Sequence, residues 1–117
     1  HLHFMTSRAE ERLSFDLQDP VPQELARSVL RLVQESLTNT QKHASAVSSV
    51  DVALSSSEGV LRLGVEDDGV ASGVPVGGSG GYGIVGMRER VELLGGRFSA
   101  GRREPTGWTV RAELPLA

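Results

Sequence analysis

Apolar and polar residues alternate along several short segments of the chain, which is typical of strands with one face toward a core. In the first segment, residues 12–17, Leu13, Phe15 and Leu17 share one face, and this pattern predicts a half-buried strand. The alternation returns in four later segments. Two of them are marked by their apolar positions, Val50, Val52 and Leu54 in one and Leu61, Leu63 and Val65 in the other. The other two cover residues 97–101 and residues 107–114, and the last has Trp108, Val110, Ala112 and Leu114 on one face. The polar run 55–59 between the second and third segments predicts a hairpin connection.

Two other segments follow the 3.6-residue period of an α-helix. The first covers residues 22–44 and has Pro22 in its first turn, where proline is tolerated. Its apolar positions on one side are Ala26, Leu30, Val33, Leu37 and Ala44, and its polar positions on roughly the opposite side are Glu35, Asn39, Lys42 and His43. The second helix covers residues 84–94 and is predicted to bury Ile84, Met87, Val91 and Leu94 before Gly95 and Gly96 end it.

The predicted order of elements is therefore β-α-β-β-α-β-β. Neighbouring strands with only two helices indicate an α+β fold, a two-layer α/β sandwich whose mostly antiparallel sheet is covered by helices on one face. Residues 12–117 are expected to form one domain, after an N-terminal tail over 1–11 that is native or left from cloning. Residues 70–81 are rich in Gly, Ser, Val and Pro without a period, and we expect a mobile loop there.

Composition narrows the possible functions. The formal net charge of the 117-residue chain is −3. Binding to nucleic acid would require an excess or a stripe of basic residues, and the sequence has neither. Cysteine is absent from the sequence, which excludes disulfides and thiolate metal sites. No apolar run approaches the roughly 20 residues of a membrane span, and the start does not look like a signal peptide. We therefore expect a soluble, cytoplasmic chain that makes no direct membrane contact. Its one lysine is Lys42.

A glycine cluster leads directly into the second predicted helix, and residues 81–86 spell G-x-G-x-x-G. Glycine backbone beside the free N–H groups of a helix start is suited to binding phosphate. A dinucleotide-binding motif of this spelling must follow a strand directly. Here residues 77–80 are Gly-Gly-Ser-Gly, and the last strand-like residue upstream is about Glu66. The spacing matches the dinucleotide motif, but the context does not.

Three blocks together resemble the ATP-binding catalytic domain of a bacterial two-component sensor histidine kinase, in the GHKL ATPase superfamily. Residues 32–44 resemble the N box of that family, and residues 65–69, Val-Glu-Asp-Asp-Gly, resemble its D-x-G box. Residues 81–96 are similar to the second glycine box of the subfamily paired with NarL-type response regulators. The final segment, residues 107–115, also fits the last strand of that family. The resemblance covers residues 12–116 and implies the GHKL ATPase fold.

The resemblance implies that the chain binds Mg²⁺-ATP and assigns a role to each motif residue. Asp67 would accept a hydrogen bond from the adenine amine, and Gly69 would let the backbone approach the base. Asn39 would be a Mg²⁺ ligand, and Glu35, one turn earlier, would orient water or metal near the triphosphate. The remaining phosphate contacts would come from Lys42, His43, Gly81, Gly83 and Gly86, with residues 70–80 as the ATP lid.

The same resemblance implies that the γ-phosphoryl group goes to a histidine on a separate dimerisation domain, with a response regulator as a further partner. The parent protein is expected to be anchored to the cell membrane. Because no histidine of the chain lies in a phosphoacceptor context, we expect that this chain cannot autophosphorylate. A GHKL anti-sigma-factor serine kinase and a degenerate, non-catalytic interaction module remain alternatives. The second is raised by Ala71, which stands where the family usually has glycine.

Each site residue also has a structural interpretation. Asp67 and Asp68 are typical of a turn after a strand. The polar side of the first helix could be a solvated face, with His43 a surface histidine. The glycine run could be a flexible loop with an incidental helix start.

Overall fold

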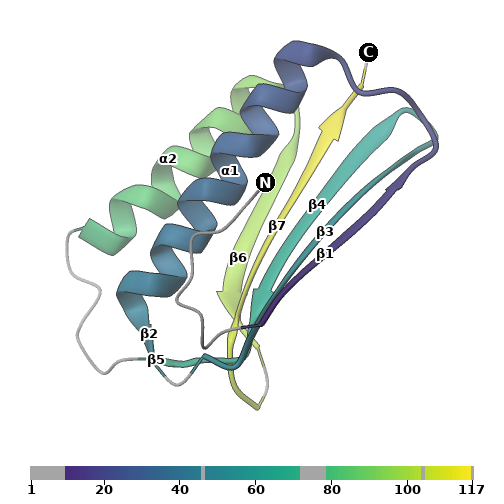
Figure 1. The fold of residues 1–117 in the computed structure, drawn as a ribbon. Helices are drawn as coiled ribbons and strands as arrows, with labels where there is room; N and C mark the ends of the chain where they lie inside the picture. Colours follow the sequence, from purple (N-terminus) through teal and green to yellow (C-terminus); the bar gives the residue numbers. More distant parts are fainter. Residues whose placement is uncertain (1–9, 46, 72–78, 104, 117) are drawn as a thin grey trace.

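The computed structural model describes residues 10–45, 47–71, 79–103 and 105–116 (Figure 1). The elements, in chain order, are β1 (Glu10–Leu17), α1 (Gln23–His43), β2 (Ala44–Ser45), β3 (Ser49–Ser57), β4 (Val60–Asp67), β5 (Val70–Ala71), α2 (Ser79–Leu93), β6 (Arg97–Arg102) and β7 (Trp108–Pro115). Every predicted strand and helix is present among them. The two-residue strands β2 and β5 were not predicted, because two residues carry no readable period.

The described strands form a five-stranded sheet in the order β1-β3-β4-β7-β6, and β2 pairs with β5 separately. β1 runs parallel to β3, whereas the pairs β3–β4, β4–β7 and β6–β7 are antiparallel. The connection from β1 to the parallel strand β3 passes through α1, as a parallel pair requires. The prediction of a mostly antiparallel sheet is confirmed.

Both helices lie on one side of the sheet (Figure 1), where α1 contacts β4 and α2 contacts β6 and β7. The core between the layers is apolar and consists of Val29, Leu32, Val33, Leu37, Val50, Val52, Leu61, Leu63, Val65, Met87, Val91, Phe98, Val110, Ala112 and Leu114. Burying such side chains contributes roughly 1.5–3 kcal/mol each, which is the main source of stability of a domain of this size. The predicted two-layer α+β sandwich is confirmed.

The buried side of α1 is rotated from the predicted one. Val33 and Leu37 are buried as predicted, but Ala26 and Leu30 are exposed. The buried side instead includes polar residues, Ser36 and Thr40. A prediction from hydrophobicity alone misses them because both hydroxyls find acceptors inside the core. The Ser36 hydroxyl donates to the carbonyl of Leu32, and the Thr40 hydroxyl lies within hydrogen-bond distance of both the Ser36 carbonyl and the Asp67 carboxylate.

The half-buried strand predicted for residues 12–17 is present as β1, but its apolar side is not buried. Leu13 pairs with Val52, and Phe15 pairs with Leu54, so these side chains point to the helix side of the sheet. Leu13, Phe15 and Leu17 are nevertheless 46%, 61% and 49% exposed. The reason is position: β1 is the edge strand, and the two helices lie over β4, β7 and β6 instead.

The second helix is longer at its start than predicted. α2 begins at Ser79, so that the glycine run is part of the helix and does not precede it. Ile84 is partly buried and Met87 and Val91 are fully buried, but Leu94, which was predicted to be buried, is exposed just after the end of the helix. The predicted stop is confirmed: Gly95 has a φ of +81°, and the amide of Gly96 donates to the carbonyl of Val91.

Candidate nucleotide site

Asp67 is the last residue of β4, and its side chain is buried with only 2% of the residue exposed. Thr40 of α1 donates its hydroxyl to the carboxylate atom Oδ2 at 3.0 Å. The backbone amide of Gly69 donates to the other oxygen, Oδ1, at 2.9 Å. The strand end, the following turn and the helix therefore fix this carboxylate inside the protein, which is not the position of an ordinary turn residue.

Burial raises the pKa of Asp67 above its usual value, because the charged form has lost water. The hydrogen bonds from Gly69 and Thr40 act in the opposite direction, since they favour the carboxylate. The Thr40 hydroxyl also lies 3.2 Å from the carbonyl of Ser36, and its single hydrogen can be donated to one acceptor at a time. Asp67 is thus a buried carboxylate that retains spare acceptor capacity for a further donor.

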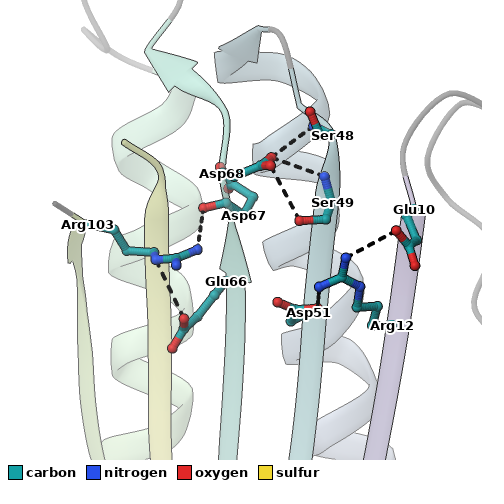
Figure 2. A network of polar contacts seen from close by, with 9 residues as sticks. All are labelled: Glu10, Arg12, Ser48, Ser49, Asp51, Glu66, Asp67, Asp68 and Arg103. Atoms are coloured by element: carbon teal, nitrogen blue, oxygen red, sulfur yellow. Dashed lines mark hydrogen bonds and ion pairs between the residues drawn. The ribbon is translucent and has the colours of Figure 1, made fainter. Parts of the chain in front are cut away.

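Arg103 and Gly107 both lie against the backbone carbonyl of Asp67. Arg103 donates from Nη1 to the carbonyl oxygen of Asp67 at 3.0 Å and forms an ion pair with Glu66 at 3.6 Å (Figure 2). Gly107 has a φ of +113°, and a Cβ there would collide with the same carbonyl oxygen. Sequence reasoning missed Thr40, Arg103 and Gly107. Only Thr40 had a signal, because it follows Asn39 in the N-box segment.

Asp68 has a different role, although it is the next residue. Its Oδ1 accepts the backbone amides of Ser48 and Ser49 at 2.8 and 3.0 Å (Figure 2). These hydrogen bonds, that of Ser49 foremost, lower the pKa of Asp68 below its usual value. Asp68 therefore anchors the start of β3, and of the two adjacent carboxylates only Asp67 lies under α1.

The helices α1 and α2 run antiparallel where they meet, and three pairs of residues define the contact. A Cβ on Gly83 would lie 3.1 Å from both side-chain atoms Oδ1 and Nδ2 of Asn39, so the glycine packs directly on this amide. One turn earlier on α1 and one turn later on α2, the Ser36 hydroxyl oxygen lies 3.5 Å from the Met87 sulfur.

The third pair joins Glu35 of α1 to Arg90 of α2, whose Nη1 lies 3.0 Å from the carboxylate. On α2, the residues that face α1 are Gly83, Met87 and Arg90, which recur at the helical spacing i, i+4, i+7. The predicted site residues Glu35, Asn39 and Gly83 are therefore brought together along one helix–helix seam.

Other predicted site residues are located less completely. Gly81 and Gly86 lie within α2, and Lys42 and His43 are the last two residues of α1, with side chains outside the described part of the structure. The predicted ATP lid falls largely on residues 72–78, which are outside the described residues. Ala71 lies in β5 opposite Ala44, an extended conformation that any residue adopts.

Among the described residues, no group of three His, Cys, Asp or Glu side chains could hold a metal ion. Asn39 is the residue that fits a role beside metal and phosphate. Its Nδ2 is buried and has no hydrogen-bond partner in the described structure. The two ends of a carboxamide are nearly equal in shape, so the same group offers an oxygen to a cation after rotation. Mg²⁺ commonly takes few protein ligands and completes its shell with phosphate oxygens and waters.

Comparison with known families decides the identity of this arrangement. Residues 24–117 match the family described as "Histidine kinase-, DNA gyrase B-, and HSP90-like ATPase". The chain belongs to this ATPase family. Membership in it implies that the chain binds ATP, and the buried Asp67 at the end of β4 lies within the matched region.

Individual relatives of this ATPase domain are sensor kinases. The chain is 29% identical to the sensor histidine kinase YxjM of Bacillus subtilis over 98% of its own length and 28% of the relative's. It is 33% identical to the signal transduction histidine-protein kinase/phosphatase DegS of Brevibacillus brevis, over 81% and 24% of the two lengths. The chain therefore spans about a quarter of these curated relatives.

A solved structure supports the same fold. The histidine kinase domain of the blue-light activated histidine kinase EL346 from Erythrobacter litoralis superposes with a TM-score of 0.67 at 30% identity. The match covers 93% of this chain and 53% of that one. Neither helix within the described ranges has the combined length and hydropathy of a membrane span.

Proposed function

We propose that this chain is the ATP-binding catalytic domain of a two-component sensor histidine kinase. In this proposal it binds Mg²⁺-ATP and donates the γ-phosphoryl group to a histidine on a separate dimerisation domain. The parent protein acts with a cognate response regulator of the NarL type and is anchored to the cell membrane. The relatives described above, which are named sensor kinases, support this choice over a serine kinase or a non-catalytic module.

The observation that carries the proposal is the carboxylate of Asp67, buried and fixed under α1. Adenine presents an exocyclic amine, and a buried carboxylate with spare acceptor capacity would bind it through a charge-assisted hydrogen bond. Gly69 lies next to this carboxylate and has no side chain to block the base. Both features favour a purine ring at the end of β4.

The phosphates would lie toward the seam between α1 and α2. Asn39 would contribute one oxygen to Mg²⁺, which neutralises charge on the transferring phosphoryl group when it is bound. Glu35, one turn earlier on α1, would orient water in the metal's shell. Gly83 packs on Asn39 without adding a side chain there. Lys42 and His43 follow Asn39 on α1 and would be further donors to phosphate. Gly81 lies in the first turn of α2, where backbone amides have no acceptor within the helix and would donate to phosphate. Gly86 lies further along α2 and would leave the helix surface there free of a side chain.

The transfer itself needs little covalent chemistry from the protein. The bond between the γ-phosphorus and its bridging oxygen breaks, and a bond to an imidazole nitrogen of the dimerisation domain forms. The contribution of this chain is to position the phosphoryl group and to stabilise its charge. The accepting histidine belongs to a domain outside this chain.

Titration with a fluorescent ATP analogue, with and without Mg²⁺, tests the proposal. The native chain should bind the analogue, and unlabelled ATP should displace it. Asp67→Asn should weaken binding by roughly tenfold or more, since a hydrogen bond to a charged group is worth about 1.5–3 kcal/mol. Asp68→Asn is the matched control, because Asp68 faces the start of β3, and it should bind as the native chain does.

A second assay tests the transfer. The chain is mixed with [γ-³²P]ATP and a separately produced dimerisation domain that carries the phosphoacceptor histidine. Acid-labile phosphate should appear on that domain and not on this chain. An absence of nucleotide binding, or equal binding by Asp67→Asn, would refute the proposed function.

A further inference from the structure

We propose that Arg90 is a positioning residue for Glu35, and through it for the Mg²⁺-dependent part of nucleotide binding. This inference rests on the proposed function, because it concerns the same site. Arg90 lies on α2, and none of its described contacts is with Asp67 or Asn39. The evidence is the ion pair across the seam between α1 and α2.

The ion pair is short and partly shielded from solvent. Arg90 Nη1 lies 3.0 Å from Glu35 Oε1, and the two side chains are only 26% and 33% exposed. An exposed pair contributes little, but a partly shielded one with this distance fixes both side chains. Arg90 is the ion-pair partner that the described residues give to Glu35. Without it, the carboxylate would lose its orientation.

The position of the pair explains why orientation matters. Glu35 and Asn39 are four residues apart on α1, so their side chains share one face about one turn apart. Gly83 packs on Asn39, and Arg90, seven residues later on α2, reaches Glu35. The same stripe of α2 therefore contacts both polar residues, and Arg90 holds the carboxylate beside the amide.

Arg88 provides the contrast, because it lies two residues away on the same helix and faces the sheet. It donates to the carbonyl of Phe98 at 3.2 Å, and its guanidinium lies 5.2 Å from the centre of the Phe98 ring. Loss of Arg88 thus removes the same charge and a packing contact from α2 without touching Glu35. It is a matched control for the loss of Arg90.

The test measures affinity for the fluorescent ATP analogue with Mg²⁺ and with EDTA, together with thermal stability. Arg90→Ala should raise the dissociation constant about fivefold with Mg²⁺, as expected for a coupling between adjacent residues. It should have little effect in EDTA, and Arg90→Lys should recover part of the loss. Added to Glu35→Gln, Arg90→Ala should cause no further loss. Arg88→Ala should lower stability while leaving the Mg²⁺-dependent affinity unchanged.

Two results would overturn the inference. Arg90→Ala could lower stability and leave Mg²⁺-dependent affinity at the native value, which would make Arg90 a packing residue only. The losses from Arg90→Ala and Glu35→Gln could instead add fully, which would show that they act independently. A native chain that binds no nucleotide is a different outcome, since it refutes the proposed function itself.

Discussion

Replacing Thr40 with valine tests whether the buried carboxylate of Asp67 depends on the α1 hydroxyl. Valine has nearly the same shape as threonine and a similar helix propensity, so that the substitution removes the hydrogen bond and little else. Thr40 is 5% exposed, and its hydroxyl lies 3.0 Å from Asp67 Oδ2. Water cannot readily replace a donor in this position.

The expected cost follows from the charge on the acceptor. A hydrogen bond to a charged group contributes about 1.5–3 kcal/mol, so the free energy of unfolding should fall by about 2 kcal/mol at neutral pH. For a domain of this length that loss corresponds to a decrease in melting temperature of about 8 °C. Urea unfolding followed by circular dichroism measures the free energy, and an unchanged slope shows that the transition remains comparable.

At low pH, the native chain and Thr40→Val should have the same free energy of unfolding. Burial raises the pKa of Asp67, and the Thr40 hydrogen bond opposes this because it stabilises the ionised form. Removal of the hydroxyl therefore raises that pKa further. The cost of Thr40→Val is fully present above the raised pKa and decreases as pH falls through it, since a protonated Asp67 no longer needs the donor.

Thr38→Val is the matched control, because Thr38 lies on the same helix and makes no hydrogen bond among the described contacts. Its cost should be within about 0.5 kcal/mol of zero. Equal costs for the two valine variants, or a Thr40→Val cost that stays constant from pH 8 to pH 4, would refute the reasoning.

Two further predictions concern residues beside this carboxylate and in α2. Gly86→Ala should raise the free energy of unfolding by up to about 1 kcal/mol, since nothing lies within 4 Å of the added Cβ, whereas Gly83→Ala should gain less because its Cβ presses on Asn39. If chemical denaturation gave the same increase in the free energy of unfolding for Gly83→Ala and Gly86→Ala, the contact between Gly83 and Asn39 would not be tight. Asp68→Ala should cost about 1 kcal/mol at neutral pH. Because hydrogen bonds from Ser49 lower the pKa of Asp68, that cost should persist below the pKa of an ordinary aspartate and vanish only as pH falls through the lowered value. A cost that disappears already at pH 5 would contradict it.

The layout of the fold was predictable because most of its elements carry a strong period. The strands β3, β4 and β7 alternate over eight or nine residues, and glycine ends α2 where a left-handed residue is needed. The wrong prediction of burial for β1 has a specific cause. Periodicity tells which residues share a face but not whether another layer covers that face, as the exposed Phe15 on the edge strand shows.

The candidate site was predictable in part. Asp67 was identified from its place after a strand and from its resemblance to a motif, and the structure adds its burial. Thr40 and Arg90 could not be assigned, because their partners lie 27 and 55 residues away in the sequence. No local pattern connects residues at that separation.

The sequence by itself determined the α+β class, the mostly antiparallel pairing and the motif order, since these depend on local periodicity and on residue types at fixed spacing. Only the tertiary structure decided which face of α1 is buried, which of two adjacent carboxylates is enclosed, and which arginine reaches Glu35. These outcomes depend on how helices and strands pack, and packing is a relation between distant segments. The physical reason is that burial and charge pairing are properties of the assembled layers and not of any one segment.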